Sequence, residues 1–385
     1  MKARIFTAFS LLVTLALLAG ASGAQAQRPQ PWRDGSLSAP EEAQQMLLEG
    51  QIGGTTGGIA IQGQYSYIGV GLRLVILDIS DPADPIFVGQ TDPFVCPVLD
   101  VVVMGGYAYV ATFISGLHII DISDPAAPTE VGRAPGFPQS VAVLGGYAYV
   151  ADGEDRGLRI INVSDPATAF EAGSCDTPGS AQGVMVAGSY AYLAAGDRGL
   201  RIIDISVPET AFEAGFCETP GNARGVAVAG SYAYVADEST GLRIIDVSDP
   251  AAPFEAGFYD TPGVAYGVAV AGSYAYVADG DSGLRIIDVS DPAAPFEAGF
   301  YDTAAYGVAL TGNYAYTAAN GLEVIDVSDP AAPFEVGFYY TMAGSDSRVA
   351  VAGSRAYLAD STEGLLILRY VPSHTVYLPL ILRNH

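Results

Sequence analysis

Histidine, the usual general base of hydrolases, is scarce in this sequence. Of its three histidines, His374 and His385 stand close to the C-terminus, and only His118 lies in the body of the chain. A Ser-His-Asp site would have to use His118, and a zinc site would lack ligands for the same reason. We therefore interpret His118 as a half-exposed strand residue, and we predict no catalytic residue, no metal site and no cofactor.

Carboxylates gather in short loops. Such loops include Asp152-Gly-Glu-Asp155, Asp279-Gly-Asp281 and Asp360-Ser-Thr-Glu363. Asp279-x-Asp281 resembles the start of a calcium loop, and clustered carboxylates favour hard cations. Because the sequence offers no bidentate Glu at the spacing that a calcium loop requires, we favour solvated turn residues over a calcium site.

The acidic loops stand next to copies of a recurring motif. Its clearest copy is Gly241-Leu-Arg-Ile-Ile-Asp-Val-Ser-Asp-Pro250, and the Asp at its sixth place recurs at 78, 121, 204, 246, 288 and 326, with Asn162 in one copy. Successive gaps are 43, 41, 42, 42, 42 and 38 residues. A period near 42 without a helical pattern predicts an all-β β-propeller of four-stranded antiparallel blades. The Asp itself we interpret as architectural, accepting backbone N–H bonds where the third strand ends.

One repeat shows the expected strands. Strand A is 225–230, strand B 232–236, strand C 242–247 and strand D 254–259. Gly230-Ser231 supplies a tight turn between A and B, because glycine tolerates the positive φ that two-residue hairpins need. The Tyr/Ala alternation of strand B suits sheets that pack large side chains against small ones.

The number of blades depends on how the ring closes. Strands A to C occur eight times, but strand D follows only seven of them clearly. The segment 46–52 has the spacing of a strand D, since Gly50 precedes Gly58 by as much as Gly299 precedes Gly307. Residues 377–381 compete for the same role. We favour closure by the N-terminal segment and therefore eight blades, with seven as the runner-up.

The motif Leu242-Arg-Ile-Ile-Asp-Val-Ser-Asp-Pro250 resembles the LVIVD repeat of bacterial and archaeal cell-surface proteins. The resemblance extends from Gly50 to Tyr370. It implies a β-propeller at the cell surface and offers no shared catalytic residue. Propellers that carry a quinone cofactor use a tryptophan in each blade, whereas this chain has only Trp32.

Positions that vary among otherwise similar blades are free for recognition. Just before or at the start of strand A, facing the central mouth, the copies carry Leu99/Asp100, Gln139, Gln182, Arg224, Tyr266, Tyr306 and Arg348. Aromatic, amide and guanidinium groups that converge on one opening favour a ligand site for a glycan or a peptide. The alternative to a ligand site is that these residues vary only because exposed loop ends tolerate random substitution. The acids Asp176, Glu218, Asp260 and Asp302 of the loops between strands D and A are expected on the same rim.

Composition and the N-terminus predict export. Lys2 and Arg4 precede the apolar run 5–18, and Ala24-Gln-Ala26 is typical of a signal-peptidase site. Cleavage there would move the formal net charge from −25 to −27, which argues against nucleic acid and anionic membrane as partners. Cys96, Cys175 and Cys217 are too few for a disulfide framework.

We therefore expect a signal peptide (1–26), a Pro-rich linker (27–45) with a short helical turn at 40–45, a propeller (46–370) and a C-terminal tail (371–385). The favoured function is a non-catalytic, secreted or cell-surface scaffold, monomeric and without an integral membrane segment, that binds an extracellular protein or glycan. The alternatives are an extracellular hydrolase or lyase that uses acids at the mouth, and a purely structural surface component.

Overall fold

The computed structural model describes residues 44–45, 47–52, 56–80, 86–153, 156–318, 321–340, 348–352, 355–360 and 364–369. All of them belong to one compact unit, 42–385. The predicted signal peptide, most of the linker and the C-terminal tail lie outside the described residues. Within the described part, no helix is both long enough and apolar enough to cross a membrane.

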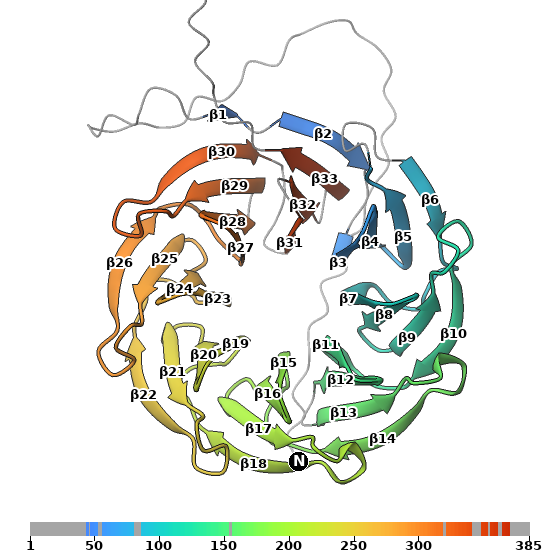
Figure 1. Cartoon of the computed structure of the whole chain (residues 1–385), viewed down its shortest axis with the longest axis horizontal. Helices are drawn as coiled ribbons and strands as arrows, with labels where there is room; N and C mark the ends of the chain where they lie inside the picture. The colour runs from blue at the N-terminus through green and yellow to red at the C-terminus, as the bar shows by residue number, and fades with distance from the viewer. Residues whose placement is uncertain are drawn as a thin grey trace, which may run out of the picture. The chain divides into compact units, whose positions relative to one another are not determined.

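The chain is an all-β propeller of antiparallel four-stranded blades (Figure 1). Eight sheets are hydrogen-bonded separately. In chain order they are β3 (Thr56–Gln62), β4 (Tyr65–Val70), β5 (Arg73–Asp78), β6 (Ile86–Gln90); β7 (Val98–Met104), β8 (Tyr107–Thr112), β9 (Gly116–Asp121), β10 (Thr129–Ala134); β11 (Pro138–Leu144), β12 (Tyr147–Asp152), β13 (Gly157–Asn162), β14 (Phe170–Cys175); β15 (Gly183–Ala187), β16 (Tyr190–Ala194), β17 (Leu200–Asp204), β18 (Phe212–Cys217); β19 (Gly225–Ala229), β20 (Tyr232–Ala236), β21 (Leu242–Asp246), β22 (Phe254–Tyr259); β23 (Gly267–Ala271), β24 (Tyr274–Ala278), β25 (Leu284–Asp288), β26 (Phe296–Tyr301); β27 (Gly307–Thr311), β28 (Tyr314–Ala318), β29 (Gly321–Asp326), β30 (Phe334–Tyr340); and β31 (Arg348–Ala352), β32 (Arg355–Asp360), β33 (Gly364–Arg369) with β2 (Leu47–Ile52).

The first strand of each blade lies nearest the centre and the last lies on the outside (Figure 1). Each inner strand contacts the next one around the ring, from β3 and β7 to β27 and β31, and β31 contacts β3 again. Two 3₁₀ turns, η1 (Pro166–Thr168) and η2 (Pro208–Thr210), follow β13 and β17. The ring is therefore continuous, and the starts of the inner strands meet around its mouth.

Closure uses the N-terminal segment, as its spacing predicted. Strand β2 pairs antiparallel with β33, with Gly50 opposite Ile367 and Ile52 opposite Leu365. The competing segment 377–381 lies outside the described residues. Gln44 and Gln45 form strand β1, which pairs in parallel with β30 at Gly337 and Phe338. The predicted helical turn is therefore wrong at residues 44–45, because the outer edge of β30 offers these residues strand hydrogen bonds.

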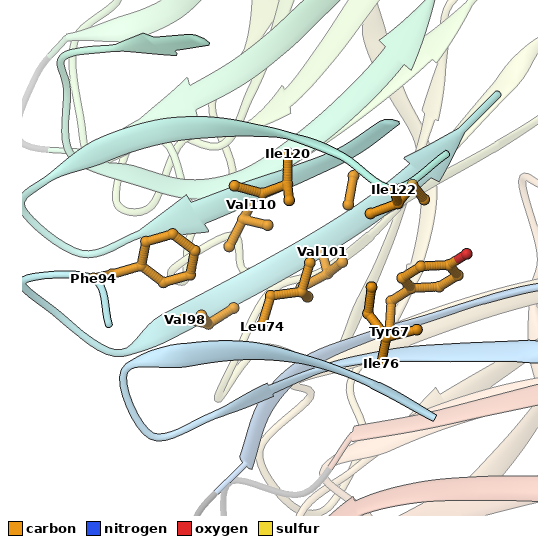
Figure 2. Close-up of a cluster of buried hydrophobic side chains, with 10 residues drawn as sticks. Tyr67, Leu74, Ile76, Phe94, Val98, Val101, Val110, Ile120 and Ile122 are labelled. Atoms are coloured by element: carbon orange, nitrogen blue, oxygen red, sulfur yellow. The ribbon is translucent and has the colours of Figure 1, made fainter. Parts of the chain in front are cut away.

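The hydrophobic core lies between neighbouring blades. Figure 2 shows one such layer, in which Tyr67, Leu74 and Ile76 of blade β3–β6 pack against residues of blade β7–β10, including Val101 and Ile120. The Tyr/Ala alternation of strand B has the predicted effect in blade β19–β22. Tyr234 and Ala236 face the next blade, where they meet Ala275 and Val277, whereas Ala233 and Val235 face the preceding one. Large side chains thus fill the space that small ones leave.

The glycine of strand D is required by the contact between blades. A Cβ at Gly257 would lie 2.2 Å from the carbonyl oxygen of Pro292 in the following blade. Gly215 has the same relation to Pro250, at 2.3 Å. The recurring Gly of one blade therefore lies in close contact with the carbonyl oxygen of the recurring Pro of the next blade. Any side chain at the Gly would push the two blades apart.

The repeated Asp of the motif is architectural, as predicted. Asp246 Oδ1 accepts the N–H of Ser248 at 2.9 Å, directly after β21 ends. The same bond joins Asp288 to Ser290 at 2.9 Å and Asn162 to Ser164 at 3.0 Å. The bond lowers the pKa of the Asp246 carboxyl, because the hydroxyl and N–H of Ser248 stabilise its charged form. Cys96, Cys175 and Cys217 are free thiols; Cys175 is buried in the core between two blades.

Candidate functional site

Three of the predicted mouth residues stand at equivalent places in three consecutive blades. Arg224, Tyr266 and Tyr306 immediately precede the inner strands β19, β23 and β27. Their N–H groups donate to the carbonyl oxygens of Ala236, Ala278 and Ala318, each at 2.9 Å. The backbone of each residue is therefore fixed by the second strand of its own blade.

Their side chains touch one another across the blades. Arg224 Cζ lies 5.6 Å from the ring centroid of Tyr266, and the rings of Tyr266 and Tyr306 are 5.2 Å apart at an interplanar angle of 62°. Arg224 Nε and Nη2 each lie 2.5 Å from Glu238 Oε1. At the other end, the Tyr306 hydroxyl donates to Asp281 Oδ1 at 2.9 Å. This bond to a carboxylate raises the pKa of Tyr306, so the phenol remains a hydrogen-bond donor at neutral pH.

We call this set the Arg–Tyr row: Asn222, Arg224, Glu238, Tyr266, Asp281 and Tyr306. Asn222 belongs to it because its Nδ2 donates to Glu238 Oε1 at 2.9 Å. The row combines a guanidinium, two phenol rings, two carboxylates and an amide. Such a set can stack on a flat ligand and hydrogen-bond to its edge.

Glu238 was not found by the sequence analysis, although it holds Arg224. Among the described residues it is the one non-glycine residue with a positive φ, 48°. The equivalent residues of the blades on either side are Gly196 and Gly280, with φ of 58° and 57°, and all three make the same backbone bridge to the next blade. A side chain in this conformation costs on the order of 1 kcal/mol. Comparison of the blades could have shown the departure, since Glu replaces a glycine there.

The strain at Glu238 gives a testable prediction. Glu238→Gly is expected to stabilise the protein by up to ~1 kcal/mol, because glycine adopts a positive φ freely and the lost Arg224 ion pair is partly exposed to solvent. The melting temperature should therefore rise by a few degrees in a thermal melt. The mirror variant Gly280→Glu is expected to lower it. A fall in both variants would show that Glu238 carries no strain.

The other predicted mouth residues do not join the row. Gln139 Nε2 lies 3.5 Å from the carbonyl oxygen of Phe137 in its own blade. Gln182 makes the same backbone bond as the row residues, to Ala194 at 2.8 Å, but its side chain makes no hydrogen bond to another described residue. Arg348 begins β31, and its backbone pairs with Ala359; its side chain lies outside the described part. Asp100 is a link between blades, because its Oδ2 accepts the N–H of Val141 at 3.0 Å.

A second polar system, also missed by the sequence analysis, lies in strand C. Arg159, Arg201, Arg243 and Arg285 are repeat-equivalent, and the last three are buried. Arg243 Cζ lies 4.5 Å from the ring centroid of Phe258, its cross-strand partner, and its Nη2 lies 2.9 Å from Asp260 Oδ1. The predicted rim acids are the partners of these arginines: Asp176 of Arg159, Glu218 of Arg201, Asp260 of Arg243 and Asp302 of Arg285. These contacts within each blade are structural.

The solvated-turn interpretation of the acidic loops is wrong for Asp152 and Asp279, which are fully buried. Asp279 Oδ1 accepts the hydroxyl of Thr261, and its Oδ2 accepts the N–H of Gly263 at 2.8 Å. Burial raises the pKa of the Asp279 carboxyl. Asp281 is exposed and bonded to Tyr306, so the two acids of the calcium-like spacing have different partners. Among the described residues, no three His, Cys, Asp or Glu side chains are grouped closely enough to hold a metal ion.

His118 is buried, 3% exposed, so its interpretation as half-exposed is wrong. It takes the place of the strand C arginine, and its ring packs on Phe94 at 4.6 Å between centroids. Its Nε2 lies 3.1 Å from Ser115 Oγ, and its Nδ1 lies 3.2 Å from Glu130 Oε1. The order Ser, His, Glu has the appearance of a catalytic triad.

The hydrogen bonds around Ser115 argue against that role. Thr112 Oγ1 lies 2.9 Å from the carbonyl oxygen of Gly116, to which only its proton can donate. Ser115, 2.7 Å from Thr112 Oγ1, must then give its own proton to Thr112. With the protons in these places, His118 Nε2 donates to Ser115 instead of accepting its proton, which argues against a role as its base. Burial lowers the pKa of His118, and the charge of Glu130 opposes this effect.

Comparison with known proteins agrees with the recurring motif. Eight stretches match the family model of the LVIVD repeat: residues 53–92, 98–134, 135–177, 178–219, 220–261, 262–303, 304–341 and 343–368. The chain belongs to the LVIVD-repeat family. The resemblance inferred from the motif is thereby confirmed. No curated protein matches the chain.

Several solved structures are similar to this LVIVD-repeat chain. Sqt1 from Saccharomyces cerevisiae has a TM-score of 0.68 at 9% identity, covering 86% of this chain and 99% of its own. The computationally designed Ika8 protein has a TM-score of 0.67 at 9% identity, covering 83% and 98%. BamB from Moraxella catarrhalis has a TM-score of 0.51 at 13% identity, covering 83% and 84%. At such identities the likeness shows the fold alone.

Proposed function

We propose that this chain is a secreted or cell-surface scaffold, a monomeric propeller of eight blades, that binds an extracellular protein or glycan without catalysing a reaction. The ligand contacts the Arg–Tyr row at the mouth. The blade count is supported by the eight separate sheets and by the pairing of β2 with β33. Export is supported by the basic start and the apolar run that precede Ala26.

One observation carries the proposal. The same position carries Arg224 in one blade and Tyr266 and Tyr306 in the next two, although the blades are otherwise similar, and the three side chains form a continuous contact. Scaffold positions repeat, as the strand C arginines and the motif Asp do. A connected set of aromatic and charged side chains at a position that varies among the blades is what a binding surface requires.

The strain at Glu238 supports the same surface. The neighbouring blades have a glycine at the equivalent position, and glycine adopts the same backbone conformation without steric cost. The chain tolerates an unfavourable φ at the one place where the carboxylate holds Arg224 over Tyr266. Backbone strain retained beside a cluster of polar and aromatic side chains is typical of functional sites.

Catalysis by the described acids has less support. Asp152, Asp237 and Asp279 are buried, and Asp237 and Asp279 are bonded to the loops that lead into their blades. The exposed acids of the loops between strands D and A pair with arginines. General acid–base catalysis needs two carboxyl groups of different pKa that face one cleft. The arrangement therefore favours binding over hydrolysis or elimination.

The triple variant Arg224→Ala, Tyr266→Ala, Tyr306→Ala tests the proposal. Wild-type protein and variant are incubated with an array of glycans and of peptides from extracellular proteins. We expect the wild type to retain specific ligands and the variant to lose them, with a melting temperature within a few degrees, because the three side chains are exposed or half-buried. Undiminished binding by the folded variant would remove this surface from consideration, and an array without wild-type ligands would overturn the proposed function.

A further inference from the structure

The Arg–Tyr row contains its own example of a bound cation. The guanidinium of Arg224 lies against the Tyr266 ring at 5.6 Å and is paired with Glu238 at 2.5 Å. An aromatic ring and a carboxylate that hold a cation from two sides form a common recognition pattern for guanidinium and ammonium groups. The contact of Arg224 therefore shows that the row can hold a guanidinium between a tyrosine ring and a carboxylate.

The next pair of blades also offers a tyrosine and a carboxylate, although Asp281 stands one residue beyond Gly280, the counterpart of Glu238. Tyr306 stands one blade beyond Tyr266 at the equivalent position, and Asp281 lies 2.9 Å from its hydroxyl. In the part of the chain that the structure describes, no arginine or lysine is paired with Asp281. Asp281 is exposed and Tyr306 is half-buried, so a group from solvent can reach both.

Charge favours a cationic ligand at this place. Within the row, Arg224 offsets one of the two carboxylates, Glu238 and Asp281, which leaves one negative charge. The whole chain has a formal net charge of −25. A field of this sign attracts cations and repels anions over about one Debye length, roughly 8 Å at physiological ionic strength. A neutral sugar would gain from the rings but would leave this charge unused.

We infer that the ligand of the Arg–Tyr row is a basic peptide segment, whose guanidinium or ammonium group binds beside Tyr306 and Asp281 as Arg224 binds beside Tyr266 and Glu238. This inference rests on the proposed function, of which it names the ligand class. The partner is then a protein with an exposed, arginine-rich or lysine-rich segment. The ring contributes an attraction to the cation, and the carboxylate supplies the ion pair.

The test uses a fluorescein-labelled peptide of alternating glycine and arginine, and a second peptide in which citrulline replaces every arginine. Citrulline keeps the shape and hydrogen bonding of the side chain but has no charge. Fluorescence anisotropy at physiological salt is expected to show binding of the arginine peptide, at least ~10-fold tighter than that of the citrulline peptide. Tyr306→Leu and Asp281→Asn should each weaken the binding of the arginine peptide several-fold.

Asp291→Asn is the matched control. Asp291 belongs to the same blade, is exposed, and caps the turn between β25 and β26 by accepting the N–H of Ala293 at 3.1 Å. The variant removes the same charge, and its side-chain oxygen can still accept that bond. It is expected to bind the arginine peptide as the wild type does.

Equal weakening by Asp281→Asn and Asp291→Asn would overturn the inference, because the attraction would then be spread over the acidic chain. Equal affinity for both peptides would overturn it as well. Absence of peptide binding, together with a glycan that the wild type retains and the Arg224, Tyr266 and Tyr306 triple variant loses, would overturn the ligand class and leave the proposed function standing. Absence of both would overturn the two together.

Discussion

Deletion of residues 27–55 is expected to lower the melting temperature by ~5 °C or more, because it removes the strand that closes the ring. Strand β2 pairs with β33 through five residue pairs, from Leu47 with Arg369 to Ile52 with Leu365. At about 1 kcal/mol net for each hydrogen bond, the ladder contributes several kcal/mol, and each kcal/mol corresponds to roughly 1–2 °C in a chain of this length. Differential scanning calorimetry measures the change.

The shorter deletion of residues 27–43 is the control for this prediction. It leaves β1 and β2 in place and should melt as the mature chain does. The longer deletion should also aggregate, because the outer edge of β33 would be unpaired and free to pair with other chains. A longer deletion that melts at the control temperature would show that another segment, such as 377–381, closes the blade.

Replacement of Glu323 by Gln is expected to stabilise the protein by about 3 kcal/mol at pH 8 and by almost nothing at pH 4. Glu323 stands in β29 where other blades have the buried arginine, and it is 9% exposed. Burial raises its pKa from the usual 4.5 to about 7, and the charge of Glu335 in β30 adds to the effect. Each pKa unit corresponds to about 1.4 kcal/mol.

The pH dependence follows from the direction of this pKa shift. Because the folded protein holds the proton of Glu323 more tightly than the unfolded chain does, the stability that this group contributes is fully present below about pH 4.5. It is lost as the pH rises through about 7. Urea unfolding of wild type and variant across pH 4 to 8 measures the difference. The exposed Glu209 provides the control, since Glu209→Gln should follow the wild-type profile. Parallel curves for wild type and Glu323→Gln would contradict the pKa shift.

The strands could be predicted because their signals are local. The predicted strands B and D of one repeat, 232–236 and 254–259, coincide with β20 and β22. Glycine at the turns, Asp246 at the end of strand C and the Tyr/Ala alternation each act within a few residues or on the adjacent sheet. Each signal recurs several times at the same place in the repeat. Ring closure by residues 47–52 could therefore be predicted, because Gly50 precedes Gly58 by as many residues as Gly299 precedes Gly307.

The polar networks could not be predicted in the same way. A strand C residue such as Arg243 appears in the sequence as the polar member of an apolar run, and its burial depends on a carboxylate and a phenylalanine of the adjoining strand and loop. His118 was taken for a half-exposed residue for the same reason. Its burial follows from Phe94, which lies in the loop between β6 and β7.

For the candidate site, the positions were predictable and the contacts were not. The entry to each inner strand is identified by the repeat, and variation among blades indicates freedom to change. Whether Arg224, Tyr266 and Tyr306 touch, while Gln139 and Gln182 remain outside the row, depends on side-chain directions between blades. Glu238 required a comparison of φ as well as of residue type.

The central claim, that the Arg–Tyr row binds the ligand, is tested most directly by two double variants on the same extracellular array. Tyr266→Ala with Tyr306→Ala removes both rings of the row, whereas Tyr232→Ala with Tyr274→Ala removes two half-buried rings that begin the second strands β20 and β24. We expect the first pair to abolish binding of the ligands that the wild type retains, and the second pair to preserve it. Loss of binding in the second pair alone, or in neither, would contradict the account.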